Sequence, residues 1–324
     1  MTTDIMQNTI KNSITCEGVG LHSGQRRRMT LHPADANSGI IFRRSDVVGC
    51  DPVVPARYDL ARDCVLCTTL TNNDGVSVST VEHLMAALAG AGIDNIVVEI
   101  DGPEVPVMDG SADPFLFLIE CAGVLALSEP RKVIRICKTI SVGDEHRGLE
   151  IAPADDLSIR FDLDYENRFI GRQFYQFTMN GDGFKNEISA SRTFGLEKEV
   201  EGLRTRGLAL GGSLENAVVV GDSGVLNPEG LRYADECVRH KILDLVGDLY
   251  LAGAPLIGSV RGRRSGHAMN NQLVRAVLEN RDAWALENQV VSANSDDAES
   301  VEGKIRPIAR KRDTVSWAEP VHAA

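Results

Sequence analysis

Short alternations of apolar and polar residues dominate the first part of the chain. The clearest are residues 28–31 and 39–42, and each is followed by a loop rich in Asp, Pro or Gly. Residues 95–100 form an apolar run of strand length with several β-branched side chains. This part of the chain is therefore predicted to be rich in β-strands.

Other segments repeat apolar residues at helical spacing. One starts at Ser79 and stops near Gly90, with a Ser and a Glu at the spacing of a capping box and an apolar stripe of Val81, Leu84, Met85 and Leu88. A second covers residues 114–127, and a third starts at Asn227 and ends at Gly253. An apolar run follows both the first and the third. A duplicated helix–strand unit is one interpretation, and chance likeness between helices is the other.

The pattern breaks near residue 130, where Glu, Pro and Arg interrupt it. A chain of 324 residues is long enough for two cores of ordinary size. We expect one domain over residues 1–130 and a second over residues 131–280. Residues 281–324 include a polar, acidic stretch and are expected to form a mobile C-terminal tail.

Composition and charge exclude several classes of protein. The formal net charge is −12, so the dense basic surface of a nonspecific nucleic-acid binder is not expected. No apolar run has the length of a signal peptide or a membrane-spanning helix, so we expect a cytoplasmic protein without stable membrane insertion. The seven scattered cysteines fit a reducing compartment better than a disulfide framework.

Common sequence motifs say little about the chemistry. Cys64 and Cys67 form a lone CxxC pair, for which two half-buried thiols are favoured over a structural zinc site. The thermolysin-type zinc motif and the Walker and dinucleotide fingerprints are absent from the sequence. The usual zinc-peptidase and nucleotidase interpretations are therefore excluded.

Two predicted helices carry a candidate metal site. His240 and Asp244 are separated by about one helical turn, so their side chains emerge on the same face. His83 lies opposite the apolar stripe of the earlier helix. Two imidazole nitrogens and a carboxylate oxygen form the ligand set of a catalytic zinc ion, and they also suit ferrous iron. The alternative is that these polar residues only form the solvated face of an amphipathic helix.

Two further residues could move protons beside such a metal. Glu82 adjoins His83 and could act as a general base, or it could be the Glu of the capping box. His267 follows a glycine at a predicted helix start and could act as a general acid if a carboxylate such as Asp248 keeps it protonated. The alternative for His267 is a surface position near a helix end.

Beyond these residues, the chain resembles the UDP-3-O-acyl-N-acetylglucosamine deacetylases, enzymes of lipid A synthesis in Gram-negative bacteria. The resemblance runs from the N-terminus to about residue 280. Six segments carry it in order: residues 18–24 (GVGLHSG), 79–84 (STVEHL), 108–112 (MDGSA), 191–195 (SRTFG), 238–244 (VRHKILD) and 265–267 (SGH).

The resemblance implies an α+β fold with two similar domains, each a β-sheet layered with helices, and an active site between them. It implies one zinc ion per chain, with ferrous iron possible, held by His83, His240 and Asp244. By the same resemblance Glu82 is the general base, and His267 is the general acid that Asp248 orients. Two further residues match family positions: Thr193, which helps to hold the oxyanion, and Lys241, which binds substrate.

The resemblance also implies an inserted βαβ segment in the second domain, at about residues 193–220, that receives the substrate's acyl chain. Its expected lining is Phe194, Leu196, Val200, Ala209 and Gly212. Without the family, residues 208–212 are simply an apolar strand and turn.

Nucleotide contacts are expected from Tyr165 and Arg264, where the family has a phenylalanine and a lysine; Arg offers a fork where Lys is a point charge. Cys67 matches a cysteine near the family's metal that is not a catalytic ligand.

The expected reaction is hydrolytic N-deacetylation of UDP-3-O-(3-hydroxyacyl)-N-acetylglucosamine, a nucleotide-sugar glycolipid precursor, with release of acetate by a monomeric enzyme. One alternative is a metal-dependent amidohydrolase acting on another acylated sugar, against which the apolar insert argues. The other is a catalytically silent metal-binding regulator. Glu82 and His267 argue against it, because both are present.

Overall fold

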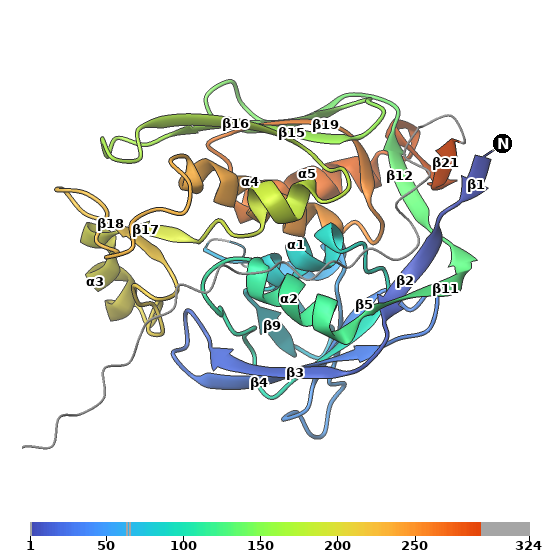
Figure 1. Ribbon diagram of the computed structural model, residues 1–324, viewed down its shortest axis with the longest axis horizontal. Coiled ribbons are helices and arrows are strands. Elements are labelled where there is room, and N and C mark those ends of the chain that lie inside the picture. The colour runs from blue at the N-terminus through green and yellow to red at the C-terminus, as the bar shows by residue number, and fades with distance from the viewer. Residues whose placement is uncertain (1, 63, 65, 293–324) are drawn as a thin grey trace, which may run out of the picture. The chain divides into compact units, whose positions relative to one another are not determined.

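The first large sheet in the computed structural model is built from the first third of the chain (Figure 1). The structure describes residues 2–62, 64 and 66–292. The sheet has five strands in the order β3 (Ile14–Val19), β4 (Arg26–Pro33), β10 (Ile96–Ile100), β5 (Ile40–Arg44) and β6 (Val53–Pro55). The pairs are antiparallel except for β10 with β5. All three strands predicted here from alternation or β-branched runs are therefore confirmed.

The second large sheet has seven strands from the later part of the chain. At its centre, β19 (Leu256–Arg263) lies between β12 (Lys132–Ile136), β14 (Gly148–Ala152) and β15 (Leu157–Asp164). The outer strands are β13 (Ile140–Gly143), β16 (Arg172–Thr178) and β20 (Trp284–Asn288). Alternate residues of β19 are buried, so one face of this sheet is turned to the core.

Four helices lie between the two sheets, as Figure 1 shows with β3 and β4 below and β15, β16 and β19 above. They are α1 (Glu82–Gly90), α2 (Asp113–Ala122), α4 (Glu236–Tyr250) and α5 (His267–Glu279). Helix α2 contacts the first sheet, α4 and α5 contact the second, and α1 packs against both α2 and α4. One continuous apolar core joins these layers. No described helix is long and apolar enough to cross a membrane.

Smaller sheets complete the fold. Strands β2 (Met6–Ile10) and β11 (Val124–Pro130) pair, and β7 (Ala61–Arg62), β8 (Thr69–Thr71) and β9 (Ser77–Ser79) form a three-stranded sheet that leads into α1. Single turns of other helical types occur at η1 (Tyr58–Leu60), η2 (Phe184–Ile188) and η3 (Arg281–Ala283).

Three predicted helix boundaries were wrong. Ser79 ends β9, and its hydroxyl donates to Pro103 O, so α1 begins at Glu82 without a side-chain cap. The helix predicted over residues 114–127 ends at Ala122, because Gly123 has a φ of +74° and the chain continues as β11. The third helix begins at Glu236 rather than at Asn227.

The side chain of Asn227 has a different role. It accepts from Val219 N and donates to the carbonyls of Leu214 and Ala217. These bonds hold the loop around β18 (Val218–Val220) rather than cap a helix.

The segment that the family resemblance marks as an insert forms a βαβ unit. Strand β17 (Phe194–Leu196) pairs in parallel with β18, and α3 (Glu197–Thr205) connects them. Parallel strands need such a crossover because a tight hairpin cannot join them. The predicted βαβ insert is therefore confirmed as a structural unit.

Residues 4–289 pack as one compact unit, and the terminal strands β1 (Thr2–Asp4) and β21 (Val290–Ser292) pair in the other. The sheets change near residue 130, but their shared core joins both halves, so the boundary there stays a prediction. Part of the expected tail, residues 284–288, instead forms β20 along β12, because Trp284 packs against the core. The tail from residue 293 onward lies outside the described residues.

Candidate metal centre and active site

The site depends on a close approach between α1 and α4. Gly247 of α4 lies directly against the backbone of Glu82, and a Cβ added there would overlap the Glu82 carbonyl oxygen. Only a glycine allows two helix backbones to approach this closely. The contact places His83 beside the face of α4 that carries His240 and Asp244, with Glu82 next to it in α1.

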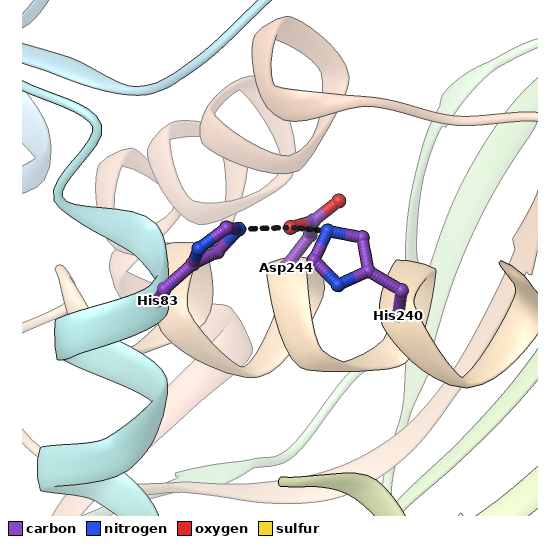
Figure 2. A group of neighbouring side chains, drawn as sticks. All are labelled: His83, His240 and Asp244. Carbon is purple, nitrogen blue, oxygen red and sulfur yellow. Dashed lines mark ion pairs between the residues drawn. The ribbon is translucent and has the colours of Figure 1, made fainter. Parts of the chain in front are cut away.

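His83, His240 and Asp244 converge on one point, as Figure 2 shows. Their potential ligand atoms all lie within 4.8 Å of one another, and all three side chains are buried. Asp244 Oδ1 is 3.6 Å from His83 Nε2 and 3.2 Å from His240 Nε2. The structure thus brings together the three residues that the sequence analysis selected as metal ligands.

Their protonation states explain why this group fits a cation. His240 Nδ1 lies 3.0 Å from Ser191 O and must donate to it, because a carbonyl can only accept. Burial lowers the pKa of His240 to about 3, against the attraction of Asp244, so the ring is neutral and Nε2 presents a lone pair. Asp244 Oδ1 accepts no hydrogen bond from the described residues. A lone pair and a carboxylate oxygen repel each other unless a cation lies between them.

Asp244 remains charged in this setting. Burial disfavours its ionised form, but the positive charges around it, those of Lys241 and His267 among them, outweigh that effect and hold its pKa well below the usual range. An ionised carboxylate and a neutral imidazole are the forms that bind a divalent ion.

The polar face of α4 is buried, so the solvated-face alternative does not hold. His240 and Asp244 are each 2% exposed, and Asp248 is fully buried. Helices α1 and α5 cover this face, while the apolar residues of α4 contact the core. Buried charges occur where they are paired or bind metals, which favours a functional explanation.

Glu82 points its carboxylate into the site rather than back to the start of its helix. Its Oε2 accepts from Thr68 N at 3.0 Å, and Oε1 lies 3.9 Å from His267 Nε2. The capping-box alternative therefore does not hold. Burial raises the pKa of Glu82, although the positive charge of His267 opposes this shift. A raised pKa makes the carboxylate a stronger base.

His267 is held at the first turn of α5 by Asp248. Its Nδ1 donates to Asp248 Oδ2 at 3.0 Å, and the residue is only 7% exposed, which excludes the surface alternative. Burial lowers the pKa of His267, but the negative charges of Asp248, Glu82 and Asp244 outweigh it and raise the pKa to about 9. The ring therefore carries its proton at neutral pH, as a general acid requires.

Lys241, Phe194 and Tyr165 form one edge of the site. Lys241 Nζ donates to Asp244 Oδ2 at 2.8 Å and lies 5.7 Å from the centre of the Phe194 ring. The Phe194 ring packs edge-on against Tyr165 at 5.7 Å and against His240 at 6.3 Å. Thr193, the preceding residue, is held through its backbone, because its N–H donates to Gly110 O.

The other predicted substrate-binding residues are spread more widely. Leu196 is buried, whereas Val200, Ala209 and Gly212 are partly exposed around α3 and the loop that follows it. That loop packs on residues 20–24, since Gly211 N donates to Leu21 O and Leu210 N donates to His22 O. Arg264 lies beside a surface hollow of about 530 Å³ that Arg172, Phe174 and His146 also line and that Tyr165 does not.

The two cysteines of the CxxC pair are buried, but neither belongs to the group of potential metal ligands among the described residues. Burial, with the nearby charge of Glu82, raises the pKa of Cys67 to about 12. Its thiol is thus protonated and a poor ligand.

Sequence reasoning missed the residues that support this site. The Ser191 carbonyl orients His240, Asn270 Nδ2 donates to Asp248 Oδ2 at 2.8 Å, and Thr68 contacts both Glu82 and Asp248. Asn270 follows His267 by one helical turn, which is a signal that could have been used. Thr68 gave no such signal, because it lies outside the helices that carry the other residues.

Comparisons with known proteins identify the family of this chain. A family model described as UDP-3-O-acyl N-acetylglycosamine deacetylase matches residues 7–279. The UDP-3-O-acyl-N-acetylglucosamine deacetylase of Histophilus somni (strain 129Pt) is 48% identical over 284 residues, which cover 86% of this chain and 92% of the relative. The protein of the same name from Shewanella violacea is 47% identical over 286 residues, covering 87% and 92%. The resemblance found in the six motifs is thereby confirmed, and the chain belongs to the UDP-3-O-acyl N-acetylglycosamine deacetylase family.

Proposed function

We propose that this protein removes the acetyl group from UDP-3-O-(3-hydroxyacyl)-N-acetylglucosamine by hydrolysis and releases acetate. The observation that carries the proposal is the buried group of His83, His240 and Asp244 next to a carboxylate base and a protonated imidazole. Family membership supports the substrate class, because the relatives are named for this deacetylation.

His83, His240 and Asp244 would hold a divalent ion, for which zinc is our first expectation and ferrous iron the alternative. When bound, this ion supplies a Lewis acid that makes water a better nucleophile and polarises the acetamide carbonyl. Lys241 keeps Asp244 Oδ2 engaged, so Oδ1 is the oxygen left to face the two imidazole nitrogens.

Glu82 and His267 divide the proton transfers. Glu82 takes a proton from the water that attacks the acetamide carbon, and burial strengthens it as a base. His267 gives a proton to the departing sugar nitrogen as the C–N bond breaks, while Asp248 holds its other ring nitrogen. Because Glu82 Oε1 and His267 Nε2 lie 3.9 Å apart, both groups can reach one amide.

The remaining family positions are proposed to bind the substrate. Thr193 would help to hold the oxyanion, and Lys241 would contact the substrate beside the reacting amide. Phe194 and the βαβ insert would receive the acyl chain, whereas Tyr165 and Arg264 would contact the nucleotide. For Arg264 this division is supported by its place beside a surface hollow that no residue of the insert lines, whereas Tyr165 packs against Phe194 and rests on the family position alone.

A direct assay tests the proposal. The purified protein is incubated with UDP-3-O-(3-hydroxyacyl)-N-acetylglucosamine, and mass spectrometry follows the loss of one acetyl group. The matched control is the same substrate with the Glu82→Gln variant. A silent metal-binding regulator would give no product with either protein, and an amidohydrolase for another sugar would act only on other acylated substrates.

Metal removal is the first prediction. Chelation should abolish turnover, and one equivalent of zinc per chain should restore it, because three side chains leave an open coordination position. His240→Ala should lose tight metal binding, as measured by elemental analysis after dialysis. Full turnover in a verified metal-free sample, or unchanged metal content in His240→Ala, would contradict the assignment.

Acyl-chain length is the second prediction. Each methylene removed from the acyl chain should lower kcat/KM, by at most a factor of about 4, since burial of a methylene contributes about 0.8 kcal/mol. Val200→Trp should penalise long-chain substrates more than short ones, while Glu201→Trp at an exposed position of α3 should not. Equal kcat/KM values for long-chain and unacylated substrates would reject an acyl site in the insert.

A further inference from the structure

Thr68 is the one described residue that hydrogen-bonds both the base and the carboxylate behind the acid. Its backbone N–H donates to Glu82 Oε2 at 3.0 Å, and its hydroxyl donates to Asp248 Oδ1 at 2.5 Å. Thr68 is fully buried, so it does not contact substrate directly. We propose that Thr68 is a positioning residue that fixes the general base and the general acid relative to each other, and this inference rests on the proposed roles of Glu82 and His267.

The direction of the hydroxyl bond follows from its neighbours. Asn271 Nδ2 donates to Thr68 Oγ1 at 3.3 Å and also to His267 O at 2.9 Å. The Thr68 oxygen therefore acts as acceptor toward Asn271, and its single proton is directed to Asp248. An ionised carboxylate can only accept, so the Thr68 hydroxyl must be the donor in its bond with Asp248.

The Thr68 hydroxyl completes the hydrogen bonding of the Asp248 carboxylate. Oδ2 accepts from His267 Nδ1 and Asn270 Nδ2, and Thr68 is the side chain that satisfies Oδ1. Asp248 is fully buried, so solvent could not replace a lost hydrogen bond to its Oδ1. Without the Thr68 hydroxyl, Asp248 loses the hydrogen bond to Oδ1 that restricts rotation of its carboxylate about the Cβ–Cγ bond. The His267 ring, which is bonded to that carboxylate, then loses its fixed orientation.

The same residue anchors the base from the opposite side. The carbonyl of Thr68 accepts from Val81 N at 3.4 Å, just before Glu82, and its N–H holds the Glu82 carboxylate. A continuous path of hydrogen bonds thus runs from Glu82 through Thr68 and Asp248 to His267. The residues that it joins come from distant parts of the sequence, so Thr68 sets a distance that neither α1 nor α4 sets alone.

The test is a graded series at position 68. Thr68→Val is nearly isosteric and keeps the backbone bond to Glu82 but removes the donor to Asp248. It should lower kcat about 10-fold to 100-fold, as is typical when a group behind a metal-site residue is lost. KM and bound metal should stay unchanged. Thr68→Ser should restore turnover close to the parent, and Thr68→Cys, a weak donor, should lie between them.

Two controls separate positioning from a purely structural role. Thr9→Val removes another buried hydroxyl, that of Thr9 in β2, which accepts from Ala34 N, and should leave kcat unchanged. In the metal-free protein, the Nδ1 proton signal of His267 in NMR spectra should shift in Thr68→Val but not in Thr9→Val. If Thr68→Val does not fold, the order of turnover in the Ser and Cys variants carries the same test.

The outcomes are distinct. A Thr68→Val protein that melts earlier but keeps the parental kcat and His267 signal would overturn the inference. Parental turnover in Glu82→Gln and His267→Ala would instead overturn the proposed roles on which it rests. In an Asp248→Asn background the Thr68→Val change should add little further loss, because its effect acts through Asp248.

Discussion

The Glu82→Gln variant is expected to fold and to bind its metal, but to turn over substrate about 100-fold to 10,000-fold more slowly. The amide cannot accept the proton of the attacking water, whereas its oxygen can still accept from Thr68 N. The fold should be unharmed, because burial already disfavours the charged form of Glu82. Steady-state kinetics on samples of known metal content would measure the loss.

The matched control is Glu99→Gln, which makes the same change of charge at a partly exposed site paired with Arg43. Its kcat should equal that of the parent. If Glu82→Gln unfolded more easily while each folded molecule kept its turnover, Glu82 would be a structural residue and the base would lie elsewhere.

The second large effect is expected at the buried ion pair between Arg192 and Glu236. Arg192 Nε and its backbone N–H both donate to Glu236 Oε1, at 2.8 Å and 3.0 Å, and Nη2 reaches Glu236 Oε2 at 3.2 Å. Arg192 is 1% exposed and Glu236 is fully buried. Arg192→Met should lower the free energy of unfolding by about 3–5 kcal/mol, because it leaves a buried carboxylate without its cation. Urea unfolding followed by circular dichroism would measure this change.

Two further variants serve as controls for the stability loss expected in Arg192→Met. Arg43→Met removes a solvent-exposed ion pair and should cost at most about 1 kcal/mol. The double variant Arg192→Met/Glu236→Met should be more stable than Arg192→Met alone, since no buried charge remains unpaired. A loss in Arg192→Met no larger than in Arg43→Met would show that solvent or another cation compensates Glu236.

This ion pair also bears on the metal site. Arg192 lies between Ser191, whose carbonyl accepts from His240 Nδ1, and Thr193, the proposed oxyanion residue. Glu236 begins α4 one turn before His240. The pair therefore joins the loop that orients His240 to the helix that carries it.

Local sequence patterns predicted the parts of the site that lie on single elements. The spacing of His240 and Asp244 placed both on one helical face, and the adjacency of Glu82 to His83 placed a carboxylate beside a candidate ligand. Alternating and β-branched residues likewise indicated β4, β5 and β10. These inferences succeed because backbone geometry alone relates residues a few positions apart.

The boundaries of the helices depended on contacts outside them. Ser79 is of a residue type that often caps helices, but it pairs as the last residue of β9. The side chain of Asn227 hydrogen-bonds a loop and caps no helix. Both side chains have the same local preference for free backbone groups in either setting. The tertiary partners available to them decided which groups they bound.

The sequence alone determined which residues could bind a metal and move protons, because residue type and helical period are local properties. Only the tertiary structure decided that the polar face of α4 is covered by α1 and α5, that Gly247 brings Glu82 against it, and that Thr68 joins Glu82 to Asp248. Periodicity shows which residues share a face but not what packs on it. Packing is set by the whole core, and the same residues on an uncovered helix would be solvated and unable to share one ion.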